Sequence, residues 1–299
     1  MDADQLVLSR WTQIAQQAML GYSGCFKPFF AEPDRLPRDT EFTLGQLHLR
    51  ATSTSETALF ITSHLKLWDA EILLRSVLEA TLKFVFICVG EGDERERRVD
   101  EFLHVLPEIA RLRRHRRAKE FLARVPDREA PQWLPLRELL MPDAELARLA
   151  ARFPREAKSR LEGKWGFTQI AESLDKTGGR FQDLVGLLFS YGMASHSVHS
   201  DGDAVLIMWD REQRGGEREK SLEFAHAARM ISDTMTYSLI RALAAYLLRG
   251  WNTKPILKVR RRFEPFQADL RLASEHWRVV EYGPRTTAGT ASDAADPAA

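Results

Sequence analysis

The segment from Leu67 to Gly90 constrains the fold most, because it has the pattern of a helix that is apolar around almost its whole circumference. A helix with so little polar surface must be covered by neighbouring elements on most sides. We therefore expect it to be the central helix of a bundle and to end near Gly90, a typical residue at a helix C-terminus. Its apolar residues are Ile72, Leu73, Leu74, Val77, Leu78, Leu82, Phe84, Val85, Phe86 and Ile87.

One polar stripe interrupts this apolar surface. Glu71, Arg75, Glu79 and Lys83 recur every four residues, so they share one helix face. On an exposed helix such residues form ordinary ion pairs of roughly 0.2–0.5 kcal/mol each. Inside a bundle, Arg and Glu side chains need each other or a ligand as a partner. Arg75 and Glu79 are therefore candidate site residues, and a simple surface ladder is the alternative.

The rest of the chain predicts a mostly α fold without alternation of strands and helices. Apolar residues recur at helical spacing over 4–20, 40–64, 217–249 and 256–282. We expect a helical bundle with a smaller helical lobe and at most a short strand or extended segment. The predicted organisation is an N-terminal helix and connector at 1–39, the main bundle at 40–250, a C-terminal helix at 251–283 and a disordered tail at 284–299.

The lobe is predicted at about 93–166, where charged residues are frequent and prolines recur. The first part, 93–125, has an amphipathic pattern that we expect to form one long helix or a pair of helices broken at Pro107. Short helices should follow as far as residue 166. Further on, the apolar run 204–209 (AVLIMW) has no clear periodicity, and it predicts an isolated strand or an extended buried segment.

Composition excludes several classes of protein. The net charge of +1 argues against a uniformly basic surface that coats nucleic acid. Only Cys25 and Cys88 are present, too few for a disulfide framework or a cysteine zinc site, so we expect a reducing, cytoplasmic location. Arg75, Glu79 and Lys83 interrupt the most apolar stretch of the chain, so we expect no membrane span.

The segment 181–203 holds the densest group of reactive side chains. Tyr191, Ser195 and His199 are spaced by four, and His196 lies next to their helix face. An imidazole titrates near neutral pH, so His199 is a candidate general acid or base. The alternative is that His196 and His199 only cap the C-terminus of a helix, where cationic or donor side chains are favoured.

Two other kinds of chemistry fit the same segment less well. His196 and His199, with Asp201, Asp203 or Glu79, have the donor types that zinc, iron or manganese prefer. We find no second His/Glu motif on a partner helix, so we expect neither a metal nor another cofactor. A hydrolase triad is disfavoured because Ser195 would lie within a helix rather than on a sharp turn.

A basic run lies in the predicted lobe. Its candidate RNA-binding residues are Arg113, Arg114, Arg116 and Arg117, whose guanidinium groups suit phosphate contacts. Acidic residues such as Glu108 and Glu120 lie close by in sequence. A solvated helix face is therefore the alternative interpretation.

Two stretches, LLRSVLEATLKFVF and FSYGMASHSVHSDG, together resemble an uncharacterised bacterial family, the domain-of-unknown-function family 5677. Its members carry an Arg-x3-Glu helix and a later Ser-x3-His element, which correspond here to Arg75, Glu79, Ser195 and His199. That family is distantly similar to the HEPN superfamily of helical bundles, many of which are metal-independent ribonucleases in toxin and antiviral systems. The similarity extends over about 40–250, and it implies a homodimer, with RNA or a protein of the same defence system as partner.

The leading hypothesis is therefore a HEPN-like endoribonuclease. His199 would assist proton transfer at the 2′-hydroxyl, Arg75 would stabilise charge on the phosphate, and Glu79 would orient Arg75 or the imidazole. Ser195 and Tyr191 would fix the imidazole tautomer. His199 has no Arg at the upstream spacing typical of HEPN enzymes, so Arg75 would have to supply that cation. The rivals are a non-catalytic interaction module with a structural polar network and, third, a metal-dependent hydrolase.

Overall fold

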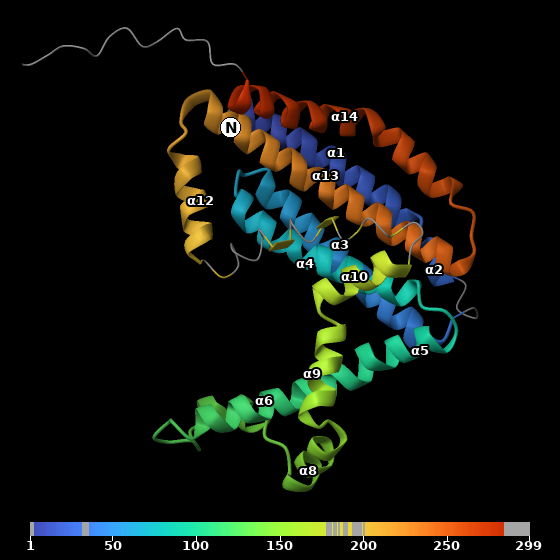
Figure 1. Cartoon of the computed structure of the whole chain (residues 1–299), viewed down its shortest axis with the longest axis vertical. Helices are drawn as coiled ribbons and strands as arrows, with labels where there is room; N and C mark the ends of the chain where they lie inside the picture. The colour runs from blue at the N-terminus through green and yellow to red at the C-terminus, as the bar shows by residue number, and fades with distance from the viewer. Residues whose placement is uncertain are drawn as a thin grey trace, which may run out of the picture.

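The computed structural model describes residues 3–31, 36–177, 181, 184, 186–187, 191–192, 199 and 201–283, and every regular element in this part of the chain is helical. A bundle of long helices forms the upper body of the molecule, and a smaller helical lobe extends below it (Figure 1). The predicted fold class, a mostly α bundle with a lobe, is confirmed. The tail predicted to be disordered, 284–299, falls outside the described residues.

The bundle is built around α4 (Leu67–Cys88), as its apolar circumference predicts. It packs against α3 (Arg38–Thr62) on one side and α13 (Gly216–Arg249) on another. The helices α1 (Ala3–Gly24) and α14 (Lys254–Tyr282) pack in turn on α13, and the short α2 (Lys27–Ala31) lies in the predicted connector. Within the described residues, no helix is both long and apolar enough to cross a bilayer.

The lobe begins as one almost continuous helical rod. α5 (Asp93–Asp100) leads into a π-helical turn at Glu101–Val105 and then into α6 (Leu106–Leu122). Pro107 lies in the first turn of α6 and does not separate two helices, because the chain remains helical on both sides of it. The wider π turn precedes it, and there Glu101 accepts hydrogen bonds from Lys164 at 2.6 Å and Trp165 at 2.9 Å.

Short helices complete the lobe and return the chain to the bundle. They are a 3₁₀ turn at Pro131–Trp133, α7 (Leu134–Arg137), α8 (Asp143–Arg152) and α9 (Arg155–Lys164). α10 (Phe167–Thr177) then packs against α4. The predicted series of short helices to about residue 166 is therefore present.

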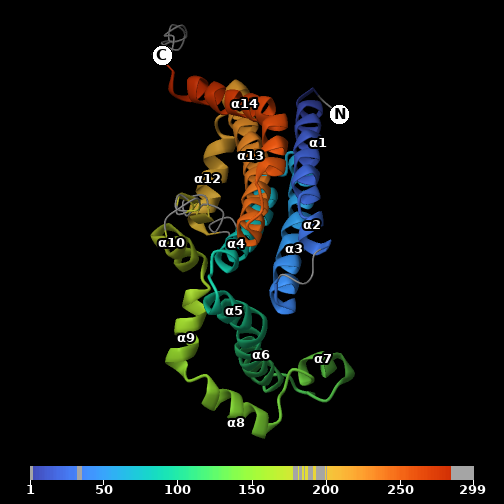
Figure 2. The ribbon, with the colours of Figure 1, turned by 90° about the vertical axis from the view of Figure 1, so that its right-hand side faces the viewer.

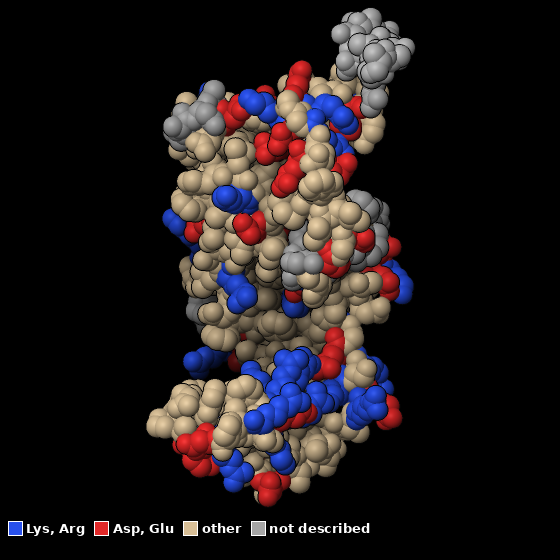
Figure 3. Space-filling view, turned by 90° about the vertical axis from the view of Figure 1, so that its left-hand side faces the viewer, with Lys and Arg blue, Asp and Glu red and all other residues tan. Residues whose placement is uncertain are grey.

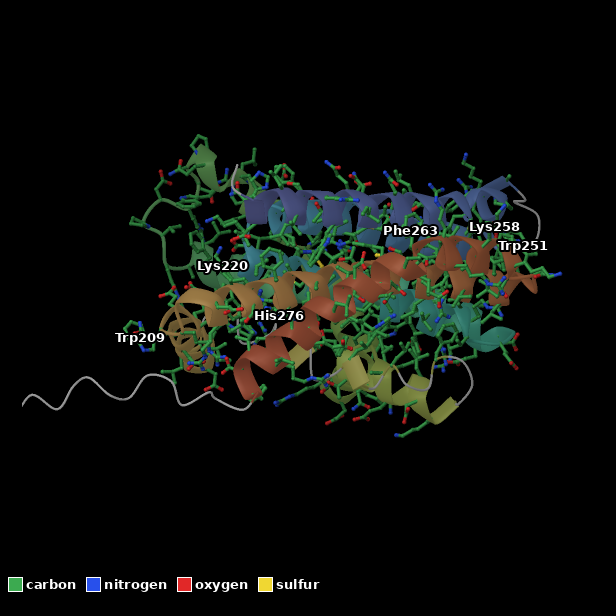
Figure 4. The ribbon with its side chains drawn as sticks, turned by 90° about the horizontal axis from the view of Figure 1, so that it is seen from above. Trp209, Lys220, Trp251, Lys258, Phe263 and His276 are labelled. Atoms are coloured by element: carbon green, nitrogen blue, oxygen red, sulfur yellow. The ribbon has the colours of Figure 1, made fainter. Side chains whose placement is uncertain are left out.

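The expectation of a strand or extended segment at 204–209 is wrong, because these residues lie in α12 (Gly202–Glu212). The Asp201 carboxylate accepts a hydrogen bond from the Ala204 amide at 3.1 Å, which is a helix N-cap that the apolar run alone does not reveal. Nor is the run fully buried, since Leu206 is 65% and Trp209 60% exposed. α12 stands apart from the bundle, and Trp209 points away from it at its outer edge (Figures 1 and 4).

A buried arginine without a carboxylate partner lies between α4 and α13. Arg241 is fully buried and donates hydrogen bonds to the hydroxyls of Thr81 at 2.6 Å and Ser238 at 3.2 Å. Burial lowers the pKa of Arg241 to about 9, and no charged group among the described residues offsets this effect. Both hydroxyls also donate to carbonyls of their own helices, so neither depends on Arg241 for a partner.

We expect Arg241→Met to raise the free energy of unfolding by about 1–4 kcal/mol, because it removes an uncompensated buried charge and leaves no unpaired hydroxyl. Urea unfolding monitored by circular dichroism measures the change. Arg249→Met is the matched control, since the buried Arg249 bonds to Glu41 at 2.7 Å and its loss should lower stability. Equal destabilisation by both substitutions would contradict this interpretation.

Candidate functional site

The polar stripe of α4 is partly buried and internally paired. Arg75 Nη2 lies 3.4 Å from Glu79 Oε1, and Lys83 Nζ lies 3.8 Å from Glu79 Oε2. The side chains of Arg75, Glu79 and Lys83 are 21%, 31% and 27% exposed, respectively. This stripe is therefore neither an open surface ladder nor part of the dry core.

Tyr191 connects the second predicted segment to this stripe. Arg75 Nη2 donates to the Tyr191 hydroxyl at 2.6 Å, and the hydroxyl donates to Glu79 Oε1 at 2.9 Å. Phe167 of α10 stacks on the Tyr191 ring with 3.6 Å between centroids, which holds the ring in place. Burial and the hydrogen bond to Glu79 raise the Tyr191 pKa. The structure thus brings Arg75, Glu79 and Tyr191 together.

The other candidates of this segment are not joined to the cluster by any described contact. His199 is exposed, and it makes no hydrogen bond or ion pair with another described residue. Ser195 and His196 lie outside the described residues. The single hydroxyl proton of Tyr191 is donated to Glu79, so Tyr191 does not donate to an imidazole while that bond exists. The catalytic role of His199 stays a prediction.

The stripe continues into a set of charged residues on α13 that the sequence interpretation missed. Glu71 Oε2 lies 2.9 Å from His226 Nε2, and Glu71 Oε1 accepts a hydrogen bond from Arg229 at 2.7 Å. The Glu71 side chain is only 7% exposed. Burial alone would raise its pKa, but the hydrogen bond from His226 and the charge of Arg229 outweigh burial and lower the pKa to about 2.

His226 also links this network to α12. Arg211 Nη1 lies 2.8 Å from His226 Nδ1, and its guanidinium carbon lies 4.4 Å from the centre of the Trp68 ring. An arginine can only donate, so Nδ1 accepts and the imidazole is neutral with its proton on Nε2, facing Glu71. An 11-residue helix is marginal on its own, so these contacts of Arg211 help to hold α12 beside the bundle.

A narrow cleft lies where the α4 stripe, Tyr191 and α13 meet. Its empty space is about 240 Å³ including the open mouth, and its lining comprises Glu71, Leu74, Arg75, Leu78, Tyr191, Arg229, Asp233 and Tyr237. Asp233 Oδ2 lies 3.3 Å from Arg229 Nη1, and its side chain is 24% exposed. Burial raises the pKa of Asp233 to about 6 even though Arg229 opposes the shift. A carboxyl group with a pKa raised toward neutrality thus lines the same cleft as the guanidinium groups of Arg75 and Arg229.

A regular sequence pattern underlies the α13 residues. Arg229, Asp233 and Tyr237 are spaced by four, and His226 precedes Arg229 by three, so all lie near one face of a single helix. The same argument that identified Arg75 and Glu79 on α4 applies to this face. This spacing can be read from the sequence, but it identifies a candidate site only once α4 is known to lie opposite α13.

Metal ligation has little support within the described residues. No group of three or more His, Cys, Asp or Glu side chains there is placed to hold a metal ion. Asp201, one of the predicted donors, instead caps α12. His196, the other imidazole of that hypothesis, lies outside the described residues.

The basic run lies on α6 in the lobe. All four predicted RNA-binding residues are exposed; Arg113 pairs with Glu162, and Arg116 lies 3.8 Å from Glu120. Arg114 and Arg117 form no ion pair with another described residue. Lys and Arg side chains gather on the part of the lobe that faces the bundle (Figure 3). Two guanidinium groups of this run are thus available to an external anion.

We expect Glu71→Gln to lower the free energy of unfolding by about 3 kcal/mol at pH 7, because the folded protein stabilises the ionised form of this carboxyl group. The folded-state pKa of about 2 lies below the usual 4.5, so this contribution is complete above about pH 4.5 and disappears as the pH falls toward 2. Urea unfolding of both proteins across this range measures the effect. Glu79→Gln, at 31% exposure, should cost less than about 1 kcal/mol.

Comparisons with known proteins identify a family and leave the chemistry open. The model of the family of unknown function DUF5677 matches residues 41–216, which is more than half of the 299 residues. Searches of curated proteins and of solved structures return no match. The matched region contains α4, the lobe, Tyr191 and α12. The chain therefore belongs to the family of unknown function DUF5677.

Proposed function

We propose that the protein is a HEPN-like, metal-independent endoribonuclease that works in the cytoplasm in bacterial stress or antiviral defence. One observation carries the proposal: Arg75, Arg229 and Asp233 line the same cleft. Two guanidinium groups suit the single negative charge of a phosphodiester and the further negative charge that develops during the reaction, and a carboxyl group with a pKa of about 6 suits a general base. The defence setting rests on the family resemblance alone.

In the proposed reaction, Asp233 accepts the proton of a ribose 2′-hydroxyl. The 2′ oxygen attacks the adjacent phosphorus, the bond from phosphorus to the 5′ oxygen breaks, and the leaving oxygen takes a proton from water. The products are a 2′,3′-cyclic phosphate and a 5′-hydroxyl end. Arg75 and Arg229 stabilise the charge that develops on the phosphoryl oxygens, and Tyr191 holds Arg75 through its 2.6 Å hydrogen bond.

The geometry also sets a requirement on this reaction. The present cleft is narrow, and the 3.3 Å contact between Arg229 and Asp233 occupies the position that a phosphate would take. A bound phosphate must replace Asp233 as the partner of Arg229. Because Arg229 keeps its bond to Glu71, it remains oriented while this exchange occurs.

RNA reaches the cleft, in this proposal, by way of the lobe. Arg114 and Arg117 are exposed on α6, and their charge attracts a polyanion without selecting a sequence. The overall net charge of +1 does not prevent this, because α6 by itself carries six Lys and Arg residues against two Glu. A single strand whose backbone contacts the lobe would extend toward the bundle.

A non-catalytic interaction module is the second candidate, and one observation favours it. Glu71 is almost fully buried and both its oxygens already have cationic or imidazole partners, which is the arrangement of a network that fixes two helices. In that case the lobe would bind a protein partner, and Asp233 would have no chemical role.

We expect Asp233→Asn to lower the rate of RNA cleavage in EDTA by about 10²–10⁴-fold, since it removes the general base. The wild-type rate should rise with pH through about 6 and then level off, because the ionised carboxylate is the active form. Labelled single-stranded RNA and gel analysis of the cyclic phosphate measure cleavage.

Two further variants make this test decisive. Asp269→Asn on α14 removes an exposed carboxylate far from the cleft and should leave the rate unchanged. His199→Ala should lower the rate less than tenfold, whereas a complete loss would identify His199 as the base instead. Absence of cleavage by every protein, with a melting temperature that falls in Asp233→Asn, would favour the interaction module.

Reversal of charge at Arg114 and Arg117 to Glu should weaken RNA binding at least tenfold at low salt, because two phosphate contacts are lost. In a plot of log affinity against log salt concentration, the slope should become shallower by about 1–2. Fluorescence anisotropy measures both quantities. The control, Arg271→Glu with Arg278→Glu, makes the same charge change at exposed positions of α14. If the control weakens RNA binding equally, the effect comes from net charge and not from contacts of Arg114 and Arg117.

A further inference from the structure

A group of exposed apolar side chains lies on one side of the bundle. α1 and α3 lie side by side there, on the side opposite α10 and α12 (Figure 2). We call this side, formed by the exposed residues of α1, α2 and α3, the α1/α3 face. Its large apolar residues are exposed by 40–65%: Leu6, Val7, Leu20, Phe30, Phe42, Leu49 and Phe60.

The α1/α3 face is also low in charge. Its three helices hold eight charged residues, four of each sign, and five of these lie in the first turn of a helix: Asp4, Lys27, Arg38, Asp39 and Glu41. Between residues 5 and 24 only Arg10 is charged, and between 42 and 63 only Arg50 and Glu56 are charged. Across the whole chain 28% of residues are charged. Depletion of charge together with exposed aromatic and aliphatic side chains is the composition of the core of a protein interface. An ordinary solvated helix face carries many more charges.

We propose that the α1/α3 face binds the same face of a second copy of this chain, forming a two-fold symmetric dimer that resembles a four-helix bundle. A neutral face offers no charge pattern with which a polyanion or an oppositely charged protein would be recognised. A second copy fits this face in composition, because each copy brings exposed apolar side chains that are surrounded mostly by polar, uncharged ones. Such a self-complementary patch is the feature that a two-fold interface requires.

The order of residues along α3 suits an antiparallel pairing with its copy. Phe42 and Phe60 lie toward opposite ends of α3, and Ser53 is a small exposed residue near its middle. With the two-fold axis at Ser53, position 60 of one copy faces position 46 of the other, so Phe60 lies between Phe42 and Leu49 of the other copy. The same register brings Arg50 near Glu56 of the other copy, so the central charges meet their opposites.

The size of the α1/α3 face is adequate for a dimer. α1 has 22 residues and α3 has 25, so at ~1.5 Å per residue each helix extends over ~33–37 Å. Two such helices side by side, each ~10 Å wide, offer roughly 700 Å² per copy, close to the ~800 Å² per partner of standard interfaces. A groove between them, lined in part by Gln13, Gln16 and Phe60, can accept side chains of the second copy.

The first test is the mass of the full-length protein in solution. The wild type should sediment as a dimer at micromolar concentration. The Leu49→Glu variant should have a dimer dissociation constant at least tenfold higher, because each copy then places a charge in the apolar contact. Leu49 is 59% exposed, so the fold should be retained, as circular dichroism will verify. Leu272→Glu on α14, a position 60% exposed, is the matched control and should remain dimeric.

The second test locates the axis. Ser53→Cys should form a disulfide between copies on mild oxidation, whereas Ser159→Cys, at an exposed serine of the lobe, should not. The native Cys25 and Cys88 are buried and should not interfere. The proposal would be overturned if the wild type is a monomer at 100 µM, or if Leu49→Glu is as dimeric as the wild type. A disulfide between copies of Ser159→Cys but not of Ser53→Cys would place the contact elsewhere and would also overturn it.

Discussion

The ionised Glu71 carboxylate is the interaction on which the arrangement of the cleft depends. It lies on the central helix α4, and its two oxygens bond to His226 and Arg229 of α13. A buried carboxylate is costly without such partners, so the register between α4 and α13 is set by the need to satisfy it. Arg229 takes its position in the cleft from this contact, and Asp233 pairs in turn with Arg229.

The network has a consequence for neighbouring groups. Burial raises the pKa of Asp233, and the charge that Glu71 retains acts in the same direction, while Arg229 opposes both. The pKa values of the two acids therefore diverge, to about 2 for Glu71 and about 6 for Asp233. One carboxyl group is thereby fixed as a structural anion, and the other is left able to exchange a proton near neutral pH.

The long helices could be predicted from sequence because the periodicity of buried residues is a local property. The strand expected at 204–209 was wrong for the converse reason: a short apolar run has no decisive period, and the Asp201 cap determines its structure. Arg75 and Glu79 were identified as polar residues on an apolar helix. Arg229, the partner of Glu71, was not, because its significance depends on which helix faces α13, a long-range property that one sequence does not contain.

The two proposed surfaces need different local charge, although the net charge of the whole chain is small. An RNA cleft needs local positive charge and open access, whereas a dimer contact needs a neutral, apolar surface. The chain separates them, with the basic run of α6 in the lobe and the α1/α3 face, which is low in charge, on the opposite side from α10 and α12 (Figures 2 and 3). Dimerisation through α1 and α3 would therefore leave both clefts open, so cleavage and self-association can be altered independently by substitution.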